Sequence, residues 1–150
     1  MPMKDTITMG TLRERAVNIN FKVGTGGDNG PADVMLVQTM IHYLAFLGNK
    51  PMHNVGLQRS ELPPISGVCE HKTKQAIFKF QRRNAGKLLA VDGLIEPALY
   101  DGRTIRPGEP RVMTMTLFHF LATEMAIFRP EAHYIDGLIK ITPQLKPWLS

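Results

Sequence analysis

The spacing of apolar residues near the start of the chain predicts a strand. In residues 16–23, apolar side chains alternate with polar ones, a period of two that is typical of a strand with one covered face: Val17, Ile19, Phe21 and Val23. No second convincing strand is visible to pair with it. We therefore expect residues 1–15 to form a loosely specified arm, and an unpaired strand edge would favour association with another chain.

A helical period replaces this alternation from about Pro31 or Ala32 to Leu47. Proline suits the first position of a helix, and Gly48 follows its expected end. The helix is apolar nearly all round, which is typical of a central helix. Something else in the chain should therefore lie over Met35 and Phe46. The connector that follows, residues 49–65, carries three prolines and is either functional or flexible.

A second helix is predicted over residues 73–85, because its apolar face repeats at helical spacing through Thr73, Ala76, Ile77 and Phe80. Gly86 is expected to end it in the left-handed conformation. Similar glycine turns stand on either side, Ser66-Gly67-Val68 before the helix and Asp92-Gly93-Leu94 after it. The second turn is expected to open a short third helix that begins at Pro97 and closes at Gly102.

The C-terminal third predicts two more helices. Pro110 can begin the first of them, and Pro130 is expected to break it after an apolar stripe of Leu117, Phe118, Leu121, Met125 and Phe128. The next is expected over about residues 131–140, before Pro143. Trp148, the single tryptophan, is expected to dock on the fold.

Several of these residues fall into a pattern that resembles a known family. Gly67-x5-Thr73-x2-Ala76-Ile77-x2-Phe80-Gln81, followed by Val91-Asp92-Gly93-Leu94-Ile95-x-Pro97, is similar to the small helical peptidoglycan-binding domain found beside many bacterial cell-wall hydrolases. Upstream, Asp33-Val34-x2-Val37-Gln38-x2-Ile41-x2-Leu44 is similar to that family's first helix. The resemblance covers about Gly24 to Gly102. Glu70 and Glu96 stand where the family usually has glycine.

The resemblance implies a mainly α fold with a peptidoglycan-binding-like bundle of three helices. We expect an N-terminal arm with a possible strand in residues 1–23, the bundle in 24–102, and a helical extension packed on it in 103–150. At 150 residues, the chain has a length that suits one domain with appendages.

The charge of the chain favours an acidic partner. Eighteen Lys and Arg residues against thirteen Asp and Glu residues give a formal net charge of +5. Nucleic acid, anionic lipid and anionic cell-wall polymers all fit this charge. Nucleic acid is the weaker choice, because only Phe78 is interleaved with the cations of the second helix. No segment approaches the roughly 20 apolar residues of a membrane span.

The first ten residues lack the apolar core of about 7 to 15 residues that a signal peptide needs. The expected location is therefore either the cytoplasm or, by a dedicated non-classical export route, the periplasm or cell surface.

Catalytic and metal-binding patterns are weak. The five histidines form no His-Glu-x-x-His arrangement, and Cys69-x-His71 could supply only two of the four ligands of a structural zinc. Glu70 and Glu96 could in principle flank a sugar as paired carboxylates, but a glycosidase also needs a deep cleft. We expect no enzyme activity, cofactor or metal.

Recognition of bacterial peptidoglycan, or of another anionic cell-wall polymer, is the function that the resemblance implies. The expected ligand-binding residues lie in the turns and on the second helix: Glu70, Gln81, Arg82, Arg83, Asp92, Gly93 and Glu96. The alternative is a protein-interaction or structural module of a bacterial secretion or phage-like assembly. Such a module would keep the fold without binding peptidoglycan and could bind a partner protein through the apolar C-terminal segment.

Overall fold

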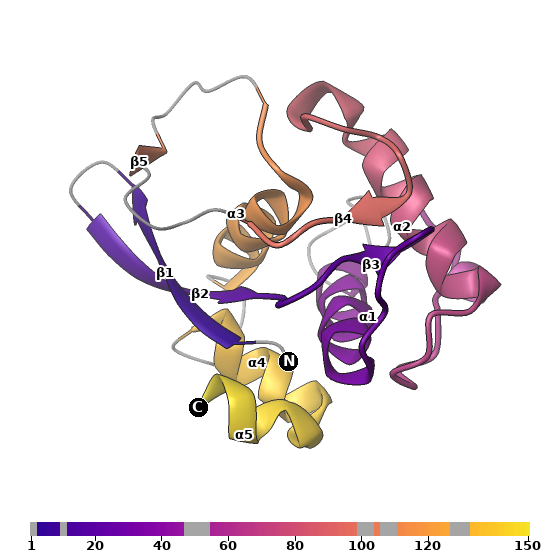
Figure 1. Ribbon diagram of the computed structural model, residues 1–150. Coiled ribbons are helices and arrows are strands. Elements are labelled where there is room, and N and C mark those ends of the chain that lie inside the picture. The colour runs from indigo at the N-terminus through magenta and orange to yellow at the C-terminus, as the bar shows by residue number, and fades with distance from the viewer. Residues whose placement is uncertain (1–2, 10–11, 47–54, 99–103, 106–110, 127–132) are drawn as a thin grey trace.

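The structure, a computed structural model, is mainly helical with two small sheets (Figure 1). It describes residues 3–9, 12–46, 55–98, 104–105, 111–126 and 133–150. The mainly α fold class predicted from the sequence is therefore confirmed. No helix in these ranges is both long and apolar enough to cross a bilayer.

The central element is α1, Pro31–Ala45, which begins at Pro31 as predicted. Most of its residues are buried, so the prediction of a central helix is confirmed. Two C-terminal helices pack against it: α3, Thr114–Ala126, and α4, Tyr134–Ile141. The approach of α4 is close, because a Cβ on Gly137 would lie 2.6 Å from the Tyr43 ring of α1.

The predicted cover over α1 is only half right. Met35 is partly buried and lines a hollow of about 360 Å³ together with Trp148 near the C-terminus. Phe46, in contrast, is 47% exposed, so the prediction that another part of the chain covers it is wrong. The reason is positional: Phe46 caps the far end of α1, one residue beyond the last helical turn.

The N-terminal segment is an antiparallel hairpin and not a loose arm. β1, Met3–Met9, pairs with β2, Leu12–Asn18, and the short β5, Thr104–Ile105, lies parallel to β1 on its other side. The expected single strand over residues 16–23 is also divided. β2 ends at Asn18, and β3, Val23–Gly24, pairs with β4, Leu94–Ile95, in a second sheet.

A buried asparagine explains where β2 ends. The Asn18 side chain donates to the carbonyl oxygen of Ala98 at 2.8 Å and accepts from the Ala98 amide at 2.9 Å. This pair of hydrogen bonds replaces a further rung of the ladder. It also holds the chain at Pro97 and Ala98 out of a helix, so the predicted third helix does not begin at Pro97. The rest of that predicted helix, residues 99–102, lies outside the described residues.

The second predicted helix is α2, His71–Arg83, and its predicted apolar face is buried. Gly86 does not end it. The helix ends at Asn84, whose amide donates to the carbonyl oxygens of Phe80 and Gln81, and a 3₁₀ turn, η2 (Ala85–Lys87), continues the chain. The Asn84 side chain also donates to the Phe80 carbonyl, so the last turn is satisfied without a left-handed glycine.

The C-terminal helices confirm the predicted pattern with shifted bounds. α3 buries Leu117, Phe118 and Leu121; the Met125 side chain, Phe128 and Pro130 are outside the described residues. After α4, Pro143 starts a 3₁₀ turn, η3 (Pro143–Leu145), and a final short helix, α5 (Lys146–Leu149), follows. Trp148 packs partly buried against the core, as predicted.

One hydrophobic cluster joins the whole fold. It includes residues from each of the three predicted segments: Val17 from the first, Ile41 and Phe80 from the second, and Phe118 and Leu138 from the third. Within residues 49–65, the described part contributes Val55 and Leu57 to this cluster and forms one 3₁₀ turn, η1 (Arg59–Glu61). The elements that carry the predicted site are thus fixed against one core.

Candidate functional site

The first glycine turn is held by a buried glutamine on α1. The Gln38 carboxamide oxygen accepts hydrogen bonds from the amides of Ser66 and Gly67, each at 2.9 Å. Its nitrogen donates to the Val68 carbonyl at 3.1 Å and to the Thr73 hydroxyl at 3.0 Å. One side chain therefore joins α1, the turn and the first turn of α2.

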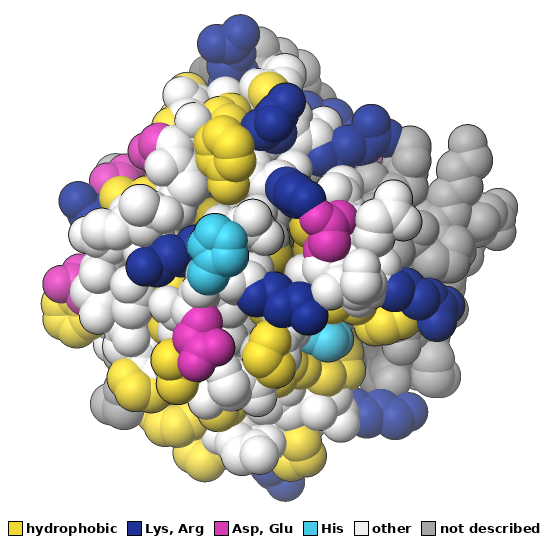
Figure 2. Space-filling view, turned by 90° about the vertical axis from the view of Figure 1, so that its right-hand side faces the viewer, with side chains coloured by type: hydrophobic (Ala, Val, Ile, Leu, Met, Phe, Trp, Pro, Cys, Tyr) yellow, Lys and Arg dark blue, Asp and Glu magenta, His cyan; other side chains and the backbone are white. Residues whose placement is uncertain are grey.

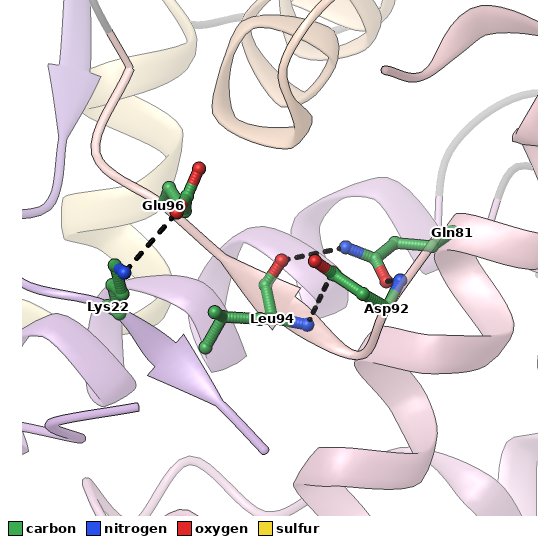
Figure 3. Close-up of polar contacts among 5 residues, drawn as sticks. All are labelled: Lys22, Gln81, Asp92, Leu94 and Glu96. Atoms are coloured by element: carbon green, nitrogen blue, oxygen red, sulfur yellow. Dashed lines mark hydrogen bonds and ion pairs between the residues drawn. The ribbon is translucent and has the colours of Figure 1, made fainter. Parts of the chain in front are cut away.

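The second glycine turn repeats this arrangement one helix later (Figure 3). The Gln81 oxygen accepts from the amides of Asp92 at 3.2 Å and Gly93 at 2.8 Å. The Gln81 nitrogen donates to the Leu94 carbonyl at 3.0 Å and to the hydroxyl of Thr114, the first residue of α3, at 3.2 Å. The likeness of the two turns in the sequence is thus a likeness of hydrogen bonding.

The turns also match in their backbone. Gly67 and Gly93 have φ angles of 78° and 76°, in the left-handed region that favours glycine. In each turn the residue before the glycine accepts from the amide after it: the Ser66 hydroxyl from Val68 and the Asp92 carboxylate from Leu94. Gln81 and Gly93 are buried, and the polar groups that a ligand would need already hydrogen-bond within the turn. Asp92, in contrast, is exposed.

The two predicted glutamates occupy different settings. Glu96 forms an ion pair with Lys22 at 3.4 Å beside the β3–β4 pair (Figure 3). Both partners are about half exposed, so this pair adds little stability. Glu70 is exposed and precedes α2, where its side chain makes no capping hydrogen bond. The repeat therefore stops before these residues.

Cys69 and His71 give no sign of a metal centre. In the part of the chain that the structure describes, no three His, Cys, Asp or Glu residues gather as a metal site would require. Cys69 is half-buried, and this burial raises the pKa of its thiol, an effect that the Lys74 ammonium partly opposes. A thiol with a raised pKa is mostly protonated at neutral pH and is a poor nucleophile.

The exposed face of α2 brings polar and aromatic side chains into one ridge. At 100° per residue, four exposed positions fall on a line opposite the buried stripe: His71, Gln75, Phe78 and Arg82. The Arg82 guanidinium lies 5.9 Å from the centroid of the Phe78 ring, within the range of a cation–π contact, and Phe78 is 41% exposed. We call these four residues the α2 ridge.

Cations surround the α2 ridge. Figure 2 shows Lys and Arg side chains spread over the face that lies at the right of Figure 1, where α2 is found, with hydrophobic side chains between them. Arg83 lies on the flank and not on the ridge, because it packs against Gly56: a Cβ on Gly56 would be 2.8 Å from the Cβ of Arg83. The basic residues of α2 and the turn after it are Lys72, Lys74, Lys79, Arg82, Arg83 and Lys87.

The structure does not bring all the predicted site residues together. Gln81, Asp92 and Gly93 meet at the second turn, and Arg82 and Arg83 lie on the outside of α2. Glu70, before α2, and Glu96, paired with Lys22, stand apart from both groups. The sequence-based set missed Gln75 and Phe78 of the α2 ridge. Their spacing with Arg82 was a usable signal, because all three stand opposite the Thr73, Ala76, Ile77 and Phe80 face.

No protein-family model, no curated protein and no solved structure matches this chain. Membership of the peptidoglycan-binding-like family therefore stays a prediction from the sequence.

Proposed function

We propose that this chain is a non-catalytic binding module for an anionic polymer of the bacterial cell wall and that it holds the polymer on the α2 ridge. The observation that carries the proposal is the exposed Phe78 ring with the Arg82 guanidinium against it. The resemblance of residues 24–102 to peptidoglycan-binding domains supports the same class of ligand.

The chemistry of the ridge suits a charged sugar. An exposed aromatic ring offers a flat apolar surface to the C–H face of a sugar ring. A guanidinium beside it presents paired N–H donors that match a carboxylate. Gln75 and His71 continue the ridge with groups that hydrogen-bond to hydroxyls. The surrounding lysines raise the local concentration of an anionic polymer.

The described carboxylates favour binding over hydrolysis. A glycosidase needs two carboxyl groups about 5 to 10 Å apart across a cleft, one of them with a raised pKa. Glu96 is instead paired with Lys22, and Asp92 accepts the Leu94 amide within its own turn.

A co-sedimentation assay with purified sacculi tests the proposal. Replacing Phe78 and Arg82 together by Ala should weaken binding about tenfold, the effect of losing roughly 1.4 kcal/mol. Both side chains are exposed, so the thermal unfolding midpoint should stay close to that of the wild type. Lys146→Ala, which removes an exposed cation on α5, is the control and should bind like the wild type.

If the Phe78 and Arg82 variant sediments with sacculi as the wild-type protein does at low salt, the α2 ridge is not the site. If the wild-type protein itself does not sediment with sacculi, the result favours the alternative function, a protein-interaction module. Leu89 and Val91, which are exposed in the segment between η2 and the second glycine turn, favour that alternative and would lie at its interface.

A further inference from the structure

We propose that the ligand surface extends to a second aromatic–guanidinium pair, Phe46 with Arg59, and that the two pairs hold different sugar units of one anionic glycan strand. This inference rests on the proposed function and names the form of its ligand. It treats the ligand as a linear polymer that lies across the face, in contrast to a single sugar or peptide held at one point.

The second pair has the same construction as the first. The Arg59 guanidinium lies 5.9 Å from the centroid of the Phe46 ring, the separation found between Arg82 and Phe78. Phe46 is 47% exposed and Phe78 41%, so each ring keeps open surface after its guanidinium is in place. The two pairs come from separate elements, the end of α1 with η1 and the C-terminal half of α2.

An ion pair joins the two aromatic–guanidinium pairs, which we call platforms. Lys79, the neighbour of Phe78, pairs with Glu61, which lies in the same 3₁₀ turn as Arg59. Glu61 also fixes that turn, because its other carboxylate oxygen accepts the Gln58 amide at 2.9 Å. Gly56, just before the turn, packs against Arg83. The turn that carries Arg59 is therefore held against the flank of α2.

The charge of this face selects an anionic occupant. Glu61, its acidic member between the platforms, is neutralised by Lys79, while Arg59 and Arg82 keep their guanidinium groups on exposed rings. Flat apolar surfaces beside cations suit a polymer whose units carry both an apolar face and an anion. Gln75 and His71 add groups that hydrogen-bond to hydroxyls. A glycan strand is the occupant that follows from the proposed function.

Two platforms make affinity depend on the length of the ligand. A strand that reaches both pairs gains from the second contact as an intramolecular event, whereas a short fragment engages one pair at a time. Long strands should therefore bind at least about tenfold more tightly than a disaccharide-peptide fragment. Neither platform alone would produce this preference.

The experiment compares two double variants by titration calorimetry with soluble glycan strands and disaccharide-peptide fragments released from purified sacculi. Phe46→Ala with Arg59→Ala should reduce the affinity for long strands about tenfold and remove the preference for length. Phe78→Ala with Arg82→Ala should do the same. The matched control is Phe21→Ala with Lys146→Ala, which removes one phenylalanine that is 59% exposed and one exposed cation elsewhere and should change neither affinity.

The outcomes separate this inference from the proposed function. If the Phe46 and Arg59 variant binds long strands like the wild type while the Phe78 and Arg82 variant does not, the second platform is overturned and the proposed function stands. If the wild-type protein binds neither strands nor fragments, the proposed function fails first. Tighter binding of single-stranded RNA or DNA than of glycan at the same salt would also overturn the inference. Unchanged thermal unfolding of each variant excludes loss of the fold as the cause.

Discussion

At the scale of single residues, the two buried glutamines are the most informative side chains of the chain. A carboxamide carries an acceptor and a donor at fixed geometry, so one side chain can satisfy the amides of a turn and the groups that follow it. Gln38 and Gln81 both do this, at 0% exposure. A buried polar group whose partners are all in place is stable, but removing it takes one hydrogen bond from each partner.

Gln81→Ala should therefore lower the free energy of unfolding by about 2 to 4 kcal/mol, because the Gly93 amide would lose its acceptor in a buried site and the Asp92 amide in a part-buried one. Gln38→Ala should have a similar effect through Ser66 and Gly67. Gln75 lies on the exposed side of α2, so Gln75→Ala should change the free energy of unfolding by no more than about 0.5 kcal/mol. Urea unfolding followed by circular dichroism measures all three. Equal stability of the Gln81 and Gln75 variants would show that water replaces the carboxamide.

Gln81 shows a limit of the sequence pattern. The resemblance places it among the ligand-binding residues on the second helix, whereas the structure buries its side chain at the border of the apolar face. A polar side chain can be buried when the fold supplies hydrogen-bond partners for it. Those partners, the amides of a turn and the hydroxyl of Thr114, come from later in the chain and have no local signal.

At the scale of elements, the long helices were predictable and the short pieces were not. α1, α2, α3 and α4 repeat their apolar positions along one helix, so periodicity together with the bounding prolines and glycines located them. β1 was missed because residues 3–9 contain four polar positions and pair with a strand that is nearly as polar. β3, β4 and β5 have two residues each, too few to show any period.

The predicted helix start at Pro97 fails for a similar reason. Pro97 after a glycine turn suits the first position of a helix, but the amide and carbonyl of Ala98 are taken by Asn18, distant in the sequence. A contact of this range leaves no trace in local composition. Of the candidate site, the basic outer side of α2 could be predicted from the sequence. The pairing of Arg59 with Phe46 could not, since it depends on the position of η1 in the folded chain.

Glycine substitutions distinguish the turns from the end of α2. Gly93→Ala should destabilise by about 1 to 2 kcal/mol, because an alanine at a φ of 76° is strained. Gly86→Ala should be neutral or should stabilise by about 0.4 to 1 kcal/mol, since a Cβ added there would meet open space and the unfolded chain loses freedom. Thermal unfolding of both variants provides the comparison. A large loss at Gly86 would restore the left-handed helix end that the sequence predicted.

At the scale of the whole molecule, the C-terminal helices complete the core that α1 begins. Leu117, Phe118 and Leu121 are buried, and α4 contacts the last turn of α1 at Tyr43. The segment after residue 102 is thus continuous with the core that the earlier residues build. A module limited to residues 24–102 would leave the side of α1 that faces these helices in water.

Removing residues 111–150 should consequently give an aggregating or partly unfolded protein. In the full chain, Leu121→Ala should cost about 2 to 5 kcal/mol, a large part of the stability of a domain of this size. Size-exclusion chromatography and urea unfolding measure the two effects, with Lys146→Ala as the control. A truncated chain that stays monomeric and unfolds cooperatively would instead make the C-terminal segment an independent unit.

The pair of hydrogen bonds between Asn18 and Ala98 also determines how the fold would respond to a pulling force. A pull on the chain at Met3 acts at the open end of the hairpin, where Met3 pairs with Asn18, so the rungs between β1 and β2 would break one after another at low force. The unzipping would run towards Met9, where β1 also pairs with β5 through Thr8 and Met9, and would then load β2 from Leu12. At Asn18 the force would meet two buried hydrogen bonds and the core behind them, which must yield together. The hairpin would thus extend before the rest of the molecule unfolds.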